Sequence, residues 1–141
     1  MKQLVKKADV LVENFRPGVM ARLGLNYGVL CQENPNLIYC AISGFGQTGP
    51  RNGDPAYDQI IQGFTGAMSI TGSPETKPYR VGYPIADTSG GMAAAMTIAA
   101  ALNAQPRGAF LDVSMTDAVL SAMGWVVSNY LIASTEPAAH G

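Results

Sequence analysis

One carboxylate, Asp87, stands between a short apolar segment and a long run rich in alanine and methionine. Two hydroxyl residues and the pair Gly90 and Gly91 follow it. An aspartate in this position is typical of a helix N-cap, because its oxygen accepts hydrogen bonds from the free N–H groups of the first turn. The helix dipole also favours the ionised carboxylate there, and the glycines leave room for another molecule to approach. The stretch predicts a carboxylate at the start of a helix over residues 88–104. Residue type and position alone favour a purely structural cap, and an accessible, reactive carboxylate is the alternative.

A second group of polar side chains follows the apolar segment at residues 10–14. The ring of Phe15 can stack on a base, and the Asn14 amide can hydrogen-bond to that base. Arg16 or Arg22 can pair with a phosphate group. A loop with a buried phenylalanine and solvated arginines is the alternative interpretation.

Tyr57 and Asp58 open a helix that we predict over residues 57–70. A phenol and a carboxylate at the start of a helix can orient a ligand, whereas a simple capped helix is the alternative. The spacing of the apolar residues predicts one buried face, which contains Ile60, Ile61, Phe64 and Met68.

Residues 44–49 match the G-x-G-x-x-G pattern of dinucleotide-binding loops and follow a predicted strand. A pyrophosphate at such a loop is held by a helix that opens inside the motif. Pro50, Gly53 and Pro55 prevent such a helix, and the acidic residue expected further along is missing. We therefore predict no NAD site but a turn-rich loop over residues 44–55, at the edge of the sheet where α/β proteins bind ligands.

The composition predicts a globular protein, since 48% of the 141 residues are hydrophobic and 13% are charged. The net charge of −1 gives no electrostatic reason to expect nucleic acid or an anionic membrane surface as a partner. The single histidine, His140, stands next to the C-terminus, which argues against Ser-His or Cys-His catalysis and a histidine-rich metal site. Cys31 and Cys40 form neither a disulfide framework nor a metal motif, so we expect buried, reduced thiols and a cytoplasmic protein.

The sequence shows no pattern typical of a targeting or membrane segment. The basic start at residues 1–7 lacks the apolar core of a signal peptide. The apolar run from Met92 to Leu102 is too short to span a bilayer, and we expect it to be a buried helix.

Strands and helices are expected to alternate along the chain, which predicts the α/β class. The first two strands are apolar without alternation, which favours a parallel sheet that is covered on both faces. They are predicted at residues 10–14, 37–43 and 110–114. Helices are predicted at residues 19–23, 27–33, 57–70, 88–104 and 116–133.

Five segments, taken in order, resemble the class III CoA-transferases, the family of formyl-CoA transferase and carnitine CoA-transferase. They are the segments VLVENFRPG, SGFGQTGP, AYD, IADTSGG and LDVSM, which begin at Val10, Ser43, Ala56, Ile85 and Leu111. The resemblance extends from residue 8 to about residue 133. It implies that residues 1–134 are the central part of a Rossmann-like large domain that joins a small domain in an interlocked homodimer. Residues 135–141 are expected to form a disordered tail.

The resemblance also implies roles for individual residues. Asp87 corresponds to the catalytic aspartate. The family segment that holds the adenine end of coenzyme A corresponds to Asn14, Phe15, Arg16 and Arg22. Tyr57 and Asp58 correspond to a stretch that lines the coenzyme A cleft. The implied reaction transfers coenzyme A between an acyl-CoA and a small carboxylic acid, without a metal or a permanently bound cofactor.

The family mechanism has Asp87 attack the thioester and form first an anhydride and then an aspartyl-CoA thioester. Thr88, Ser89 and the amides of Gly90 and Gly91 are candidate donors to the developing oxyanions. Two alternatives stay open. The chain is an inactive truncated fragment of such an enzyme, or it is an acyl-CoA racemase, although racemases of the family carry a histidine in place of Tyr57.

Overall fold

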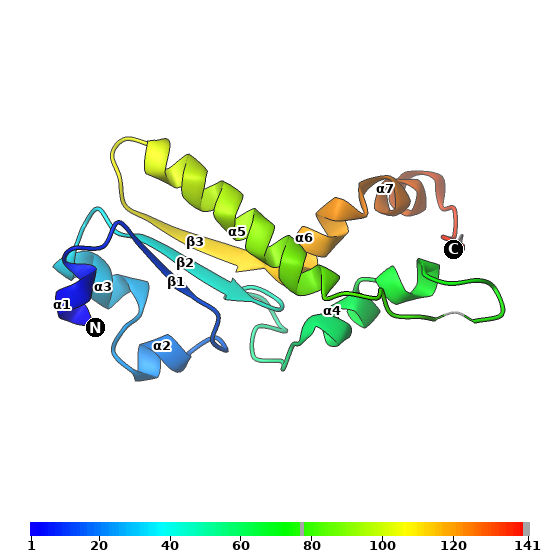
Figure 1. The fold of residues 1–141 in the computed structure, drawn as a ribbon, viewed down its shortest axis with the longest axis horizontal. Coiled ribbons are helices and arrows are strands. Elements are labelled where there is room, and N and C mark those ends of the chain that lie inside the picture. The colour runs from blue at the N-terminus through cyan, green and yellow to red at the C-terminus, as the bar shows by residue number, and fades with distance from the viewer. Residues whose placement is uncertain (77, 140–141) are drawn as a thin grey trace.

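The centre of the computed structural model, which describes residues 1–76 and 78–139, is a parallel sheet (Figure 1). Strands β1 (Val10–Glu13), β2 (Ile38–Ser43) and β3 (Ala109–Ser114) lie in the order β1-β2-β3, and both neighbouring pairs are parallel. The middle strand is covered on both faces, which explains why its sequence does not alternate between polar and apolar residues. The predicted α/β class with a parallel sheet is confirmed.

Helices cover the two faces of this sheet unequally. The short helices α1 (Lys2–Val5), α2 (Val19–Arg22) and α3 (Tyr27–Glu33) pack on one face, and the long helix α5 (Ile85–Asn103) crosses the other (Figure 1). The buried core on the first face consists of Val5, Met20, Leu30, Leu37, Tyr39 and Ala41. The core under α5 is smaller and consists of Cys40, Ala94 and Val113.

The helix predicted over residues 57–70 is divided in the structure. It forms α4 (Asp58–Phe64) and then a 3-10 helix, η1 (Ala67–Ile70). Gly66 separates the two with a backbone φ of +82°, a left-handed conformation that an L-residue with a side chain adopts at a cost.

The predicted apolar face of this segment is only partly correct. Ile61 is fully buried, but Ile60 is 43% exposed and Phe64 is 50% exposed. The Phe64 ring instead contacts the loop before α4, where it meets the Phe45 ring edge to face at 5.1 Å. The guanidinium of Arg51 lies 4.9 Å from the centre of the same ring. Phe64 therefore holds the loop of residues 44–55, the glycine-rich loop, against α4.

The helix predicted over residues 116–133 is also divided, into α6 (Met115–Ala122) and α7 (Gly124–Ala133). The first of these is capped by Ser114, whose hydroxyl oxygen accepts the N–H of Asp117 at 3.2 Å. Residue 114 is also the last residue of β3, so the chain passes from strand to helix without a loop.

Helix α5 begins earlier than predicted, at Ile85 rather than at residue 88. Pro84 occupies the N-cap position, and Asp87 lies inside the first turn. The prediction that Asp87 caps its own helix is therefore wrong.

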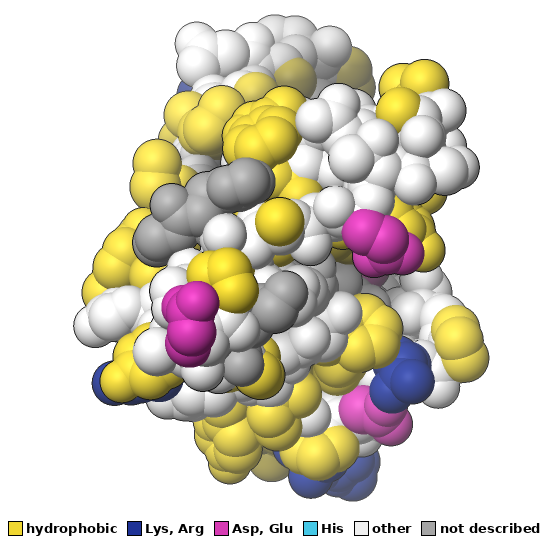
Figure 2. Space-filling view, turned by 90° about the vertical axis from the view of Figure 1, so that its right-hand side faces the viewer, with side chains coloured by type: hydrophobic (Ala, Val, Ile, Leu, Met, Phe, Trp, Pro, Cys, Tyr) yellow, Lys and Arg dark blue, Asp and Glu magenta, His cyan; other side chains and the backbone are white. Residues whose placement is uncertain are grey.

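The expectation that α5 is a buried helix is also wrong for most of its surface. Its buried residues are Ala86, Gly90 and Ala94, which form one narrow stripe. On the other side, Met92 is 62% exposed and Met96 is 71% exposed. Figure 2 views the end of the molecule at which α4 and α7 lie, and hydrophobic side chains are widespread on that surface as well.

By length and composition alone, α5 is long and apolar enough to cross a bilayer, with a mean hydropathy of 1.3. Its packing accounts for that composition in another way, because it contacts β2, β3, α4 and α6. Small residues on the buried stripe allow these elements to approach the helix closely.

The two neighbouring glycines of α5 have different surroundings. A Cβ on Gly90 would lie 2.9 Å from Cγ of Met115, closer than real contacts of this kind. A Cβ on Gly91 would have no heavy atom within 4 Å. Gly90 therefore permits the packing of α5 on α6, whereas Gly91 leaves an open surface.

This difference predicts opposite effects of two alanine substitutions on the free energy of unfolding. Gly90→Ala should lower it by about 1–2 kcal/mol, because the buried Met115 side chain must move. Gly91→Ala should raise it by about 0.5–1 kcal/mol, because alanine favours a helix and meets no neighbour. Urea unfolding of both variants measures the difference, and equal effects would contradict the close packing at Gly90.

Candidate active site

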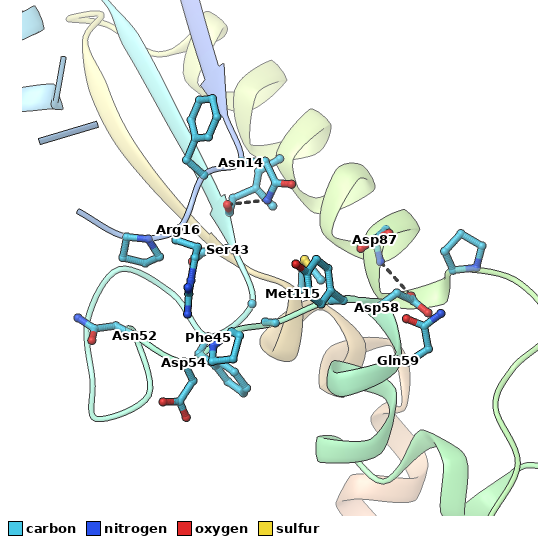
Figure 3. A pocket seen from close by; sticks show the side chains of 18 of the residues that line it. Asn14, Arg16, Ser43, Phe45, Asn52, Asp54, Asp58, Gln59, Asp87 and Met115 are labelled. Atoms are coloured by element: carbon cyan, nitrogen blue, oxygen red, sulfur yellow. Dashed lines mark hydrogen bonds between the residues drawn. The ribbon is translucent and has the colours of Figure 1, made fainter. Parts of the chain in front are cut away.

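A cleft of about 640 Å³ opens at the carboxyl ends of β1 and β2, where parallel sheets commonly bind ligands (Figure 3). Six of the seven predicted site residues line it: Asn14, Phe15, Arg16, Tyr57, Asp58 and Asp87. The seventh, Arg22, ends α2 and is not among the described residues that line the cleft. Segments far apart in the sequence are thus brought to one site, as the strand topology predicts.

The loop after β1 is fixed across the end of β2. The Asn14 side-chain amide donates to the carbonyl of Ile42 at 2.8 Å, and the guanidinium of Arg16 donates to the carbonyl of Gly53 at 3.3 Å. Phe15 is 55% exposed, so the interpretation of this residue as a buried phenylalanine is wrong. Its ring is accessible on the wall of the cleft.

Glu13, the last residue of β1, holds this loop through a hydrogen bond, a role that was not predicted from the sequence. Its carboxylate accepts the N–H of Phe15 at 2.7 Å, although the residue is only 8% exposed. Burial raises the pKa of Glu13, and the hydrogen bond from Phe15 opposes that rise. A single acidic residue at the end of an apolar strand was the signal for this role.

The glycine-rich loop between β2 and α4 is a wall of the cleft and does not open into a helix. The motif ends at Gly49, well before α4 begins at Asp58. The backbone N–H of Gln47 donates to both carboxylate oxygens of Asp112, at 3.1 and 3.0 Å. The prediction of a turn-rich loop is confirmed.

Asp58 makes the contact that positions the start of α5. It is 5% exposed, and its Oδ1 accepts the N–H of Ala86 at 2.7 Å and that of Asp87 at 3.4 Å (Figure 3). Its Oδ2 accepts a hydrogen bond from the side-chain amide of Gln62. The carboxylate that caps α5 therefore comes from α4, and its oxygens are engaged within the protein.

Gln62 extends this network and was also missed from the sequence. It is fully buried, and its Oε1 accepts the N–H of Val81 at 2.9 Å while its Nε2 lies 3.4 Å from the carbonyl of Tyr83. Asp58 and Gln62 stand four positions apart, on one face of the helix with Ile61, and this spacing was the signal for a buried network.

Asp87 lines the cleft with an exposed side chain. Burial raises its pKa, and the negative charge of Asp58 raises it further. We expected the helix N-terminus to favour the ionised form and so to lower the pKa of Asp87, but the pKa is raised. The first-turn N–H groups of Ala86 and Asp87 already bond to Asp58, and that of Ile85 bonds to the carbonyl of Tyr83.

The glycine amides proposed as oxyanion donors are not free either. Because α5 begins at Ile85, the amides of Gly90 and Gly91 lie inside the helix, where each bonds to the carbonyl four residues earlier. Gly91 instead lines the cleft one turn after Asp87, without a side chain to obstruct the carboxylate.

Tyr57 presents its side chain to the cleft from the N-cap position of α4. It is 73% exposed and makes no capping hydrogen bond with its side chain. Its phenol is thus accessible to a ligand, whereas the carboxylate of the neighbouring Asp58 is hydrogen-bonded within the protein.

No cluster of three or more metal-ligating side chains occurs among residues 1–76 and 78–139. Cys40 is fully buried, and burial with the nearby charges of Glu13 and Asp112 raises its thiol pKa, which disfavours the thiolate. His140 lies outside the described residues.

Comparison with known proteins identifies the relatives of this chain. The family model described as CoA-transferase family III matches residues 1–141. Acetyl-CoA:oxalate CoA-transferase of Acetobacter aceti is 53% identical over 123 residues, which are 84% of this chain and 32% of that protein. Succinate–glutarate CoA-transferase of Agrobacterium fabrum is 41% identical over 140 residues, which are 97% of this chain and 35% of that protein.

A solved structure shares the same fold. The crystal structure of a CAIB/BAIF family protein from Brucella suis superposes with a TM-score of 0.94 at 36% identity. The match covers 99% of this chain and 38% of that one. The chain spans about a third of the length of the curated relatives. Because the family model matches its whole length and a family structure shares its backbone, the chain belongs to CoA-transferase family III.

Proposed function

We propose that this chain carries the reactive carboxylate of an enzyme that transfers coenzyme A between an acyl-CoA and a small carboxylic acid. The observation that carries the proposal is the place of Asp87, which is accessible on a cleft that Phe15 and Arg16 also line. The relatives named as CoA-transferases support the reaction class. Coenzyme A enters as part of the substrate, and the reaction needs no permanently bound cofactor.

The proposed reaction uses Asp87 as a nucleophile. An ionised carboxylate oxygen attacks the thioester carbonyl of the donor, so that a mixed anhydride forms and the coenzyme A thiolate leaves. The thiolate then attacks the aspartyl carbonyl and releases the donor acid. The carboxylate of the acceptor acid attacks the resulting aspartyl-CoA thioester, and the returning thiolate forms the new acyl-CoA and restores Asp87.

The other predicted residues supply binding. We propose that Phe15 stacks on the adenine and that Asn14 contacts the adenine with its side-chain oxygen. The side-chain NH2 of Asn14 already donates to the carbonyl of Ile42 in β2. Arg16 is the only cation among the described residues that line the cleft, which suits a phosphate group. Arg22 then contacts the distal end of coenzyme A from outside the cleft. Such remote contacts provide binding energy that is used at the reacting carbon.

Tyr57 and Asp58 have different roles in this proposal. The exposed Tyr57 contacts the acyl-CoA, while Asp58 holds the first turn of α5 in place and sets the position of Asp87. No histidine occupies position 57, so nothing in the described site favours the racemase alternative.

We further propose that residues 1–134 belong to the large domain of a cytoplasmic, homodimeric enzyme, with residues 135–141 as a tail. The exposed apolar residues of α5 and α7 support burial in an assembly. Met96 is 71% exposed, Trp125 is 68% exposed and Ile132 is 86% exposed. Apolar surface of this kind is typical of faces that pack against another element or subunit.

Trapping with hydroxylamine tests the role of Asp87. Acetyl-CoA and oxalate, the pair named for the Acetobacter aceti relative, are incubated with the purified protein and hydroxylamine. An anhydride or thioester at Asp87 is converted to a hydroxamate, which peptide mass spectrometry locates. Asp87→Asn should abolish it, because an amide is not a nucleophile at neutral pH.

Asp117→Asn is the matched control. Asp117 holds the same place in the first turn of α6 as Asp87 holds in α5, but it does not line the cleft. This variant should form the hydroxamate at the wild-type rate. A hydroxamate that persists in Asp87→Asn, or none in the wild-type protein, would contradict the proposed reaction.

The pH dependence follows from the raised pKa of Asp87. Because the ionised form reacts, the rate of hydroxamate formation should rise with pH through a value above the ordinary 3.8 of an aspartate. Asp58→Asn removes the negative charge nearby, so the rising limb should move to lower pH. Its amide also faces that of Gln62, donor against donor, which should lower the free energy of unfolding by about 1–2 kcal/mol.

Asp54→Asn controls for the change in net charge. Asp54 lines the same cleft but forms an exposed ion pair with Arg51. This variant should leave the pH profile and the stability nearly unchanged. A carbon-13 NMR titration of the Asp87 carboxyl gives the pKa directly, and an unchanged value in Asp58→Asn would contradict the coupling.

A further inference from the structure

Among the described residues that line the cleft, Ser43 has a buried side-chain hydroxyl that makes no hydrogen bond within the protein. It ends β2, it is 5% exposed, and it lines the cleft (Figure 3). Its hydroxyl has no hydrogen-bond partner among the described residues. A buried hydroxyl without a partner is unfavourable, so such groups in native proteins commonly meet a ligand or solvent.

Two polar side chains that lie near the end of β2 have partners elsewhere. Ser114, which pairs with Ser43 in the sheet register, accepts the N–H of Asp117 and lies 3.5 Å from the carbonyl of Gly44. The hydroxyl of Thr116 donates to that same carbonyl at 2.8 Å. These neighbours have structural roles, whereas the buried Ser43 hydroxyl has no partner among the described residues.

The position of Ser43 indicates which part of a ligand it meets. Asn14 bonds to the carbonyl of Ile42, the residue directly before Ser43, so the loop that carries Phe15 and Arg16 lies across this end of β2. Asp87 approaches the cleft from a different element, α5. Ser43 is therefore associated with the part of the cleft assigned to coenzyme A rather than to the reacting acyl group.

We propose that the Ser43 hydroxyl donates a hydrogen bond to an acceptor oxygen of coenzyme A. This inference rests on the proposed function. Both the amide carbonyls of the pantetheine arm and the phosphate oxygens offer that chemistry. Ser43 is then a binding residue that pairs only when the substrate is present.

The test is the dissociation constant of coenzyme A, measured by calorimetry for the wild-type protein and for Ser43→Ala. One hydrogen bond is worth about 0.5–1.5 kcal/mol, so the variant should bind about 2- to 12-fold more weakly. Its melting temperature should be unchanged or higher, because the substitution removes a buried polar group that has no partner in the free protein.

Ser114→Ala is the matched control, since it removes a hydroxyl from the neighbouring position of β3 that has a structural partner. It should lower the melting temperature through loss of the α6 cap and leave the dissociation constant within about twofold of wild type. Adenosine 3′,5′-bisphosphate and pantetheine distinguish the two sources of the acceptor. The weakening in Ser43→Ala should appear with the fragment that carries the contacted oxygen.

Two results would overturn the inference by itself. Either Ser43→Ala binds coenzyme A as tightly as wild type, or it loses melting temperature without a change in binding, as expected for a structural hydroxyl. If the wild-type protein does not bind coenzyme A at all, the proposed function fails, and this inference fails with it.

Discussion

The site depends on one contact, in which the buried carboxylate of Asp58 accepts the first amides of α5. These amides would otherwise be unpaired at a helix end. The contact fixes where α5 begins, and therefore which face of the helix carries Asp87 toward the cleft. It also joins α4 to α5 through a charged group that Gln62 holds in place. A nucleophile on a rigid helix is positioned more accurately than one on a loop.

The same contact changes the electrostatics of Asp87. A helix N-terminus usually stabilises a nearby anion, but here Asp58 has already taken the amides of Ala86 and Asp87. Burial and the second negative charge then raise the pKa of Asp87. A carboxylate that is harder to ionise is also a more basic nucleophile once it is ionised. The arrangement therefore exchanges ease of ionisation for reactivity.

The sequence predicted the sheet well and the helix ends poorly. Apolar segments identified all three strands and their parallel arrangement, although only β2 is covered on both faces. The start of α5 was misplaced, because its cap is a side chain from α4, 28 residues away in sequence, and no local pattern shows it. Gly66 divided a helix whose apolar spacing looked continuous. The burial of Ser43 was not predicted, because a single serine at the end of a strand does not reveal whether it is buried.

The loop before α5 is tied down at two points. The N–H of Tyr79 bonds to the carbonyl of Met68 in η1, and Gln62 holds the backbone at Val81 and Tyr83. Between these anchors and Asp87 the chain has little freedom, whereas the part of the loop before Tyr79 is outside them. That part can change in length and sequence without displacing the Asp87 carboxylate. The fold thus separates this part of the loop from the helix that carries the proposed nucleophile, so a change in one need not disturb the other.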